Sequence, residues 1–115
     1  MEPIRGYGPA SYGQRESVAE KVFGIPPEAA PAWRRLQAGR RLNVTPCDGR
    51  PEWISESRTD RREAARLCAG CPIADLCGTY ASTADERAGV WAGHDMTSPA
   101  QRKALRDQQN GAVAA

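Results

Sequence analysis

The sequence predicts a small all-α domain of three to five short helices. Apolar residues recur at helical spacing in short segments, Pro and Gly separate these segments, and no run alternates as a strand would. Leu, Ile, Val and Phe together number only 15 of the 115 residues, so the core should be thin. The net charge of only +2 argues against a disordered chain. We therefore expect a disulfide, a metal or a partner to supply the missing stability.

Residues 1–42 are expected to form an N-terminal extension, partly disordered and partly in short helices. Residues 1–16 mix Gly, Pro, Ser and Tyr without a period, which is typical of disorder. One short helix is expected over 17–25. A second is expected over 31–38, with Gly39 as its stop.

Two further helices are expected after a loop over 42–58. The first covers 60–68, with Asp60 and Glu63 placed as in a capping box. The second covers 72–84. Its apolar residues fall at i, i+3, i+4 and i+7 and therefore share one face: Ile73, Leu76, Cys77 and Tyr80.

Residues 98–115 are expected to form a C-terminal basic helix and a flexible tail. The helix should cover 98–109, with Ser98 and Gln101 as a capping box and Asn110–Gly111 as its stop. Three positive charges on this helix give only a modest attraction to phosphate. They are nevertheless the candidates for contact with DNA: Arg102, Lys103 and Arg106.

The stretch GVWAG, residues 89–93, predicts a tight chain reversal. Gly89 and Gly93 allow positive φ without a Cβ clash. An apolar side chain at such a turn either packs into the protein or contacts a partner, and both roles remain open for Trp91. Trp53, in contrast, is expected to pack in the core.

Two absences and the cysteine content indicate the compartment. No run of 18 apolar residues exists, and the N-terminus has no apolar signal-peptide core, so we expect a cytoplasmic protein with no membrane contact. In a reducing cytosol, four cysteines are more often metal ligands or redox groups than structural disulfides.

The four cysteines follow the spacing C-x20-C-x2-C-x5-C, and they are Cys47, Cys68, Cys71 and Cys77. Four thiolates can hold zinc or an iron–sulfur cluster. Zinc ribbons usually pair two C-x2-C motifs and only one is present, which weakens the zinc interpretation. A thioredoxin-like redox pair would need a βαβ unit, and no strands are predicted. The spacing alone leaves all three possibilities open.

The cysteine spacing followed by G-V-W-x-G resembles the WhiB-like family of actinobacterial and actinophage regulators. The likeness covers roughly residues 43–106 and includes the segment Met96–Pro99 and the basic helix that follows it. The family's usual turn is G-V-W-G-G, so Ala92 replaces a glycine. If this position needs positive φ, alanine costs about 1 kcal/mol.

The resemblance implies a helical domain over residues 43–97, wrapped round a 4Fe–4S cluster that the four cysteines bind. It implies a transcriptional regulator and not an enzyme, with a cluster that responds to redox change or nitric oxide. The protein is expected to dock as a monomer on the C-terminal region of the principal sigma factor. The residues that correspond to the family's sigma contact are Gly89, Val90, Trp91 and Gly93. Promoter DNA is expected to be contacted only indirectly or weakly, because the tail lacks a dense basic run.

Two alternatives belong to other functional classes. The first is a thiol–disulfide reductase that uses Cys68 and Cys71 without a metal, because Cys71 at a helix N-terminus would have a lowered pKa. The second is an interaction module held together by structural zinc.

Overall fold

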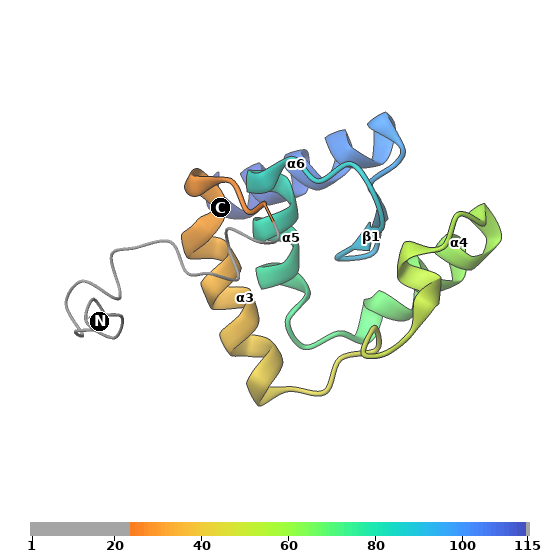
Figure 1. Ribbon diagram of the computed structural model, residues 1–115. Helices are drawn as coiled ribbons and strands as arrows, with labels where there is room; N and C mark the ends of the chain where they lie inside the picture. Colours follow the sequence, from red (N-terminus) through yellow and green to blue (C-terminus); the bar gives the residue numbers. More distant parts are fainter. Residues whose placement is uncertain (1–23, 115) are drawn as a thin grey trace, which may run out of the picture.

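The computed structural model describes residues 24–114 of the chain. These residues are mostly helical, with one short hairpin (Figure 1). The α-helices are α3 (Ala30–Leu42), α4 (Arg58–Leu67), α5 (Ala74–Ala84) and α6 (Pro99–Ala114). Short 3-10 helices cover Pro27–Ala29, Pro51–Ile54 and Cys68–Gly70, and the hairpin strands are β1 (Val90–Trp91) and β2 (His94–Asp95).

The all-α prediction therefore holds for most of the described chain, and the expectation of no strands is wrong for this hairpin. The expected disorder over 1–16 and most of the expected helix over 17–25 lie outside the described residues. No helix of the described part is long and apolar enough to cross a membrane.

Helix α3 continues through Gly39, so the predicted stop at this residue is wrong. A Cβ atom at Gly39 would lie 2.9 Å from Leu76 Cδ1 and 3.2 Å from Ile73 Cγ2. Glycine is therefore needed here for the close approach of α3 to α5, rather than to end the helix. The helix ends at Leu42 and is capped by Asn43, whose side-chain amide donates to the Gly39 carbonyl at 2.9 Å.

Helix α4 begins two residues earlier than expected, because its N-cap is Ser57. The Ser57 Oγ accepts a hydrogen bond from the Asp60 backbone N–H at 3.3 Å. The Asp60 carboxylate instead accepts from Ser55 Oγ at 2.8 Å. The predicted cap at Asp60 was thus three residues too late.

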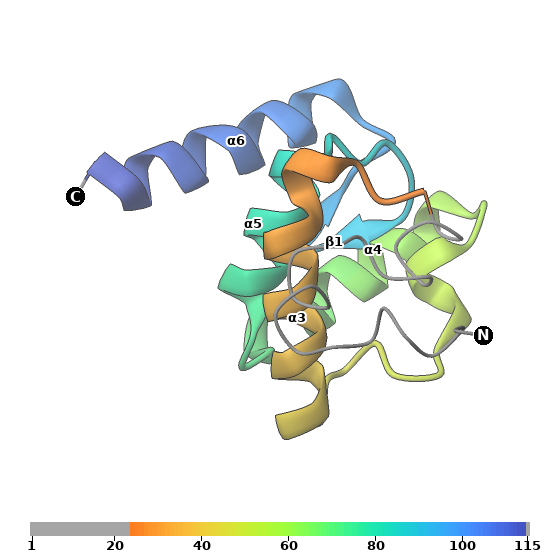
Figure 2. The same cartoon turned by 60° about the vertical axis from the view of Figure 1, so that its left-hand side comes forward.

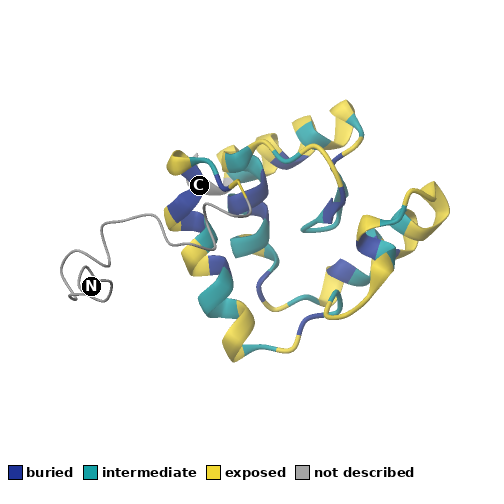
Figure 3. Cartoon of the chain, viewed as in Figure 1, coloured by how far each residue is buried: buried dark blue, intermediate teal, exposed yellow. Residues whose placement is uncertain are grey.

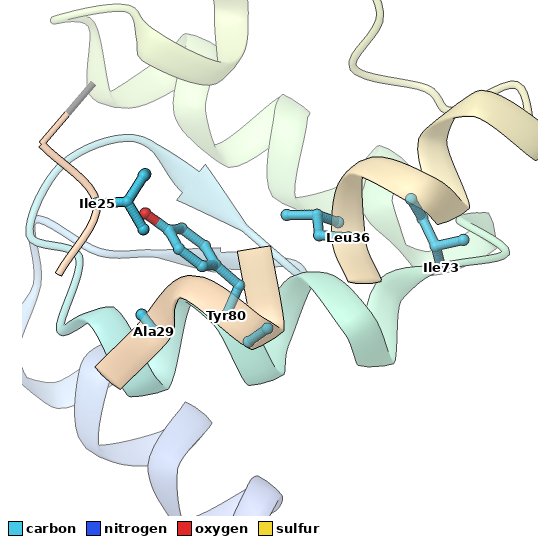
Figure 4. Packing of buried hydrophobic residues seen from close by; sticks show 6 residues of the cluster. Ile25, Ala29, Leu36, Ile73 and Tyr80 are labelled. Atoms are coloured by element: carbon cyan, nitrogen blue, oxygen red, sulfur yellow. The ribbon is translucent and has the colours of Figure 1, made fainter. Parts of the chain in front are cut away.

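Helix α5 presents the apolar face that the spacing predicts. Ile73 and Tyr80 are buried, and Leu76 and Cys77 pack against the same group of buried residues (Figure 4). The helix begins at Ala74 rather than at Pro72. The N-cap of this helix is Ile73. Cys71 therefore lies two residues before the N-cap and not at the helix N-terminus itself.

Helix α6 lies against α5 and extends beyond it to Ala114 (Figure 2). Asn110–Gly111 does not stop it, so that prediction is wrong. At its start, Ser98 Oγ accepts from the Gln101 N–H at 3.2 Å, as a cap should. The Gln101 side chain accepts from the Asp95 N–H at 2.8 Å and fixes the end of the hairpin.

The buried side chains form three small groups rather than one core. Figure 3 shows the buried positions as short stretches on the helices and the hairpin, with exposed positions between them. The α3–α5 cluster contains Ile25, Ala29, Ala32, Leu36, Ile73 and Tyr80. The α4 cluster contains Trp53, Ala64, Cys68 and Val90. The α6 cluster contains Ala81, Met96 and Leu105. Groups this small bury little apolar surface each, as the composition predicts.

An ion pair joins α4 to the hairpin. Arg61 Nε lies 2.9 Å from Asp95 Oδ2, and both side chains are only 13% exposed. Arg61 Nη1 also donates to the Ser55 carbonyl at 2.8 Å. Burial raises the pKa of Asp95, but hydrogen bonds from Thr97 and Arg61 outweigh it and hold this pKa below its usual range.

Replacing Arg61 with Met should lower the free energy of unfolding by about 2 kcal/mol, because the Asp95 carboxylate and the Ser55 carbonyl both lose a donor. Arg62→Met, on an exposed position of the same helix, is the matched control and should change it by less than about 0.5 kcal/mol. Anaerobic urea unfolding measures both values. Equal losses for the two variants would contradict the role of the pair.

Candidate metal centre

A cavity of about 460 Å³ lies between the α3–α5 cluster and the α4 cluster. Leu36 and Ile73 of the first cluster line one side, and Trp53 and Val90 of the second line another. All four cysteines also line this cavity. The structure thus brings together four thiols that the sequence spreads over 31 residues.

The cysteines are divided evenly between the two clusters. Cys68 belongs to the α4 cluster and Cys47 packs against it. Cys71 and Cys77 pack against the α3–α5 cluster. All four are free of disulfides. A centre bound by all four sulfurs would therefore link the two clusters.

Two side chains hydrogen-bond to sulfur atoms at the cavity. Trp53 Nε1 donates to Cys68 Sγ at 3.3 Å. Thr45 Oγ1 lies 3.3 Å from Cys47 Sγ and can donate to it when the sulfur is a thiolate. Trp53 is only 6% exposed, which confirms its predicted place in the core.

The hairpin contributes backbone donors to two further contacts. The N–H of Gly93 bonds to Cys68, and the N–H of Ala92 bonds to Cys77. Both bonds favour the charged thiolate and lower the pKa of the cysteine that accepts them. The hairpin therefore touches one cysteine from each side of the cavity.

Residues 90–95 form a hairpin whose strands are joined by a two-residue turn. Val90 pairs with Asp95 and Trp91 pairs with His94. The connecting residues Ala92 and Gly93 have φ of 51° and 82°. Positive φ at both positions is the requirement of a type I′ turn. Alanine therefore adopts the left-handed conformation at Ala92 and carries its strain.

Trp91 is partly exposed at the cavity wall. Its ring lies 5.3 Å from that of Tyr80, which in turn lies 5.2 Å from the ring of Trp33. Its Nε1 donates to the Ala88 carbonyl at 2.9 Å. Trp91 thus has both internal packing and an accessible edge. His94 bonds to the Ala92 carbonyl at 2.9 Å and does not line the cavity.

Burial opposes ionisation of the thiols. The pKa of Cys77 is raised to about 12, mainly by burial and to a smaller extent by the neighbouring cysteines, although the bond from the Ala92 N–H lowers it. Burial likewise raises the pKa of Cys68, against the bonds from Trp53 and Gly93. Thiolates at these positions need a compensating cation, and a metal centre supplies one. The raised pKa of Cys68 and the displaced helix start after Cys71 both argue against the reductase alternative.

The four thiols are a donor set that fits an iron–sulfur cluster, and four thiolates can also hold zinc. Among residues 24–114, no three His, Cys, Asp or Glu side chains come close enough together to hold a single ion. A zinc ion, with Zn–S bonds of about 2.3 Å, needs four sulfurs about 3.8 Å apart. All four thiols line one cavity, and cysteine thiolates are the usual ligands of iron–sulfur clusters.

The three candidate DNA-binding residues on α6 lie outside the cavity wall. Arg102 donates to the Met96 carbonyl at 2.8 Å, and Lys103 pairs with Asp107 at 2.6 Å. Arg106 is exposed. Arg102 is thus engaged within the protein, whereas Lys103 and Arg106 are exposed.

One wall of the cavity was missed by the sequence analysis. It comes from α3 and consists of Trp33, Leu36, Gln37 and Arg40. These residues fall at i, i+3, i+4 and i+7, a spacing that was available as a signal for one face. Arg40 also pairs with Asp48 at 3.3 Å, which ties the end of α3 to the loop that carries Cys47.

Comparison with known proteins decides the family. A family model described as Transcription factor WhiB matches residues 38–105, more than half of the chain. The chain belongs to the WhiB family. The match includes all four cysteines and the hairpin.

Named WhiB proteins are similar over the same region. The transcriptional regulator WhiB7 of Mycolicibacterium smegmatis is 43% identical over 70 residues, covering 57% of this chain and 68% of that protein. The transcriptional regulator WhiB2 of Mycobacterium tuberculosis is 34% identical over 70 residues, covering 60% and 71%. WhiB2 of M. smegmatis is 44% identical over 41 residues, covering 36% and 32%. No solved structure gives a significant match.

The WhiB match begins within α3, at residue 38. Arg40 lies inside the match, whereas Trp33, Leu36 and Gln37 lie before it. Three of the four residues that α3 contributes to the cavity wall therefore lie outside the matched segment.

Replacing Ala92 with Gly, the usual residue of the WhiB turn, should leave the unfolding free energy within about 0.5 kcal/mol of wild type. Relief of about 1 kcal/mol of left-handed strain is offset by two losses. One is the methyl group that packs against the α6 cluster, and the other is the added freedom of glycine in the unfolded chain.

The control is Gly93→Ala, which adds a methyl at φ 82° that would meet only Ala65 O at 3.6 Å and Cys68 Cβ at 3.7 Å. It should cost about 1–2 kcal/mol in the same urea experiment. A stabilisation above about 1 kcal/mol by Ala92→Gly would show that the Ala92 methyl contributes nothing.

Proposed function

We propose that this WhiB-family transcription factor holds a 4Fe–4S cluster on its four cysteines and uses it as a sensor. The observation that carries the proposal is the single cavity that all four thiols line, two from each apolar cluster. The ligands would be Cys47, Cys68, Cys71 and Cys77. When bound, such a cluster supplies a redox-active centre that oxygen or nitric oxide can attack.

The protein's own residues would bind and shield this centre. The N–H groups of Trp53, Ala92 and Gly93 would orient and stabilise the ligating thiolates. Trp33 and Leu36 would cover one side with apolar surface and limit the entry of water.

Loss of the metal centre would change the protein's shape, because the free energy of binding the centre also stabilises the folded state. The two apolar clusters would lose the link between them, and the hairpin would lose the thiolates that accept its Ala92 and Gly93 N–H groups. We propose that this loss is the output of the sensor, because the surface around Trp91 would no longer be held in place.

The proposed partner is the C-terminal region of the principal sigma factor, bound by one copy of this chain. The resemblance of the hairpin to the WhiB-like turn supports the partner's identity. Apolar residues exposed near the cavity support a contact here, since Ile54 is 80% exposed and Val44 is 88% exposed. The bond from Arg102 to the Met96 carbonyl leaves two of the three positive charges of α6 available, Lys103 being held only in an exposed pair. So few charges favour indirect or weak contact with promoter DNA.

The first test is metal analysis of the full chain purified without oxygen. We expect about four iron and four sulfide per chain with a brown colour, and a loss of most of both in Cys77→Ser. His94→Ala is the control, because His94 follows the turn without lining the cavity, and it should keep its iron. A colourless protein with one zinc per chain would contradict the proposal and favour the interaction module.

The second test concerns the sigma contact. Trp91→Ala should weaken binding to the sigma C-terminal region at least about tenfold, because it removes a large aromatic contact, while the iron content stays unchanged. Arg62→Ala, on exposed α4 surface, should bind like wild type. Calorimetric titration of iron-matched samples measures both. Unchanged affinity of Trp91→Ala would show that the hairpin is not the contact.

A further inference from the structure

The wall of the cavity contains a buried donor that has no acceptor. Gln37 lines the cavity, and its side-chain Nε2 is buried without a hydrogen-bond partner in the described part of the chain. A buried amide left unpaired costs about 1–3 kcal/mol. Such a group is therefore expected to find its acceptor in whatever fills the cavity.

Gln37 is a polar residue on a face of α3 where its neighbours are apolar or already paired. Trp33 and Leu36 lie on the same helix face and are apolar, and they pack in or against the α3–α5 cluster. Arg40, one turn further on, has its partner in Asp48. Gln37 is thus a neutral donor on an otherwise apolar or satisfied face that borders the cysteines.

The proposed occupant offers only acceptors. Thiolate and inorganic sulfide sulfurs accept hydrogen bonds, and a 4Fe–4S cluster with four thiolate ligands carries net negative charge. Donors already reach Cys47, Cys68 and Cys77 from other elements of the fold. Gln37 would add an uncharged N–H from α3.

We propose that Gln37 is a positioning residue that donates a hydrogen bond to a sulfur of the metal centre and so tunes its reduction potential. This inference rests on the proposed function, because it requires a cluster in the cavity. Gln37 lies just before the segment that matches the WhiB family model.

The expected effect follows from the charge of the two redox states. A donor to sulfur stabilises the more negative, reduced state more strongly, and this raises the potential. Gln37→Leu keeps most of the volume and removes the donor, so its midpoint should move to a more negative value. At the wild-type midpoint, the ratio of reduced to oxidised cluster should fall by about threefold or more, as the loss of one hydrogen bond would produce.

The experiment is an anaerobic redox titration of the full chain with dithionite, followed by electron paramagnetic resonance on samples matched for iron and sulfide. Gln37→Glu, close in shape but without the amide donor, should shift the midpoint in the same direction as Gln37→Leu. Gln109→Leu is the control, because Gln109 is a partly buried glutamine on α6 that bonds to Thr79 away from the cavity. Its midpoint should equal that of wild type.

The outcomes distinguish a failure of the role of Gln37 from a failure of the proposed cluster-binding function. An iron-loaded chain whose midpoint is the same in wild type, Gln37→Leu and Gln37→Glu overturns the role of Gln37 alone. A wild-type chain without iron and sulfide overturns the proposed function, and this inference with it. Equal shifts for Gln37→Leu and Gln109→Leu also overturn it, because they would reflect a general loss of packing.

Discussion

The fold depends on two small apolar clusters that face each other across a cavity lined by four thiols. Cys47 and Cys68 stand on the α4 side, and Cys71 and Cys77 stand on the α3–α5 side. Neither cluster alone buries enough surface to stabilise a domain of this size. A centre that binds all four sulfurs would therefore supply structure and chemistry through the same bonds.

The hairpin connects this centre to the rest of the molecule. Its turn donates N–H groups to one thiol on each side of the cavity, and Asp95 on its second strand pairs with Arg61 of α4. Trp91 on its first strand packs against Tyr80 with the two rings tilted, and it is partly exposed. A change at the sulfurs can reach the surface through these few contacts, which is what a sensor with a protein partner requires.

The sequence predicted features that depend on local pattern and missed those that depend on how the elements meet. The apolar face of α5 followed from helical spacing and is present. The predicted helix stop at Gly39 was wrong because this glycine is needed for the close approach of α3 to α5. The predicted stop at Asn110–Gly111 was also wrong, because α6 continues through both residues to Ala114. The role of Gln37 required knowledge of the cavity, since its amide is unusual only beside the cysteines.

The central claim is that the metal centre holds the two clusters together, and the fate of the fold after its removal tests this most directly. The measurement is far-ultraviolet circular dichroism of the full chain before and after anaerobic removal of the metal with a chelator. If the metal centre holds the clusters together, most of the helical signal is lost on its removal and returns when iron and sulfide are restored. A metal-free chain that keeps its helical signal and still unfolds cooperatively on heating would contradict it.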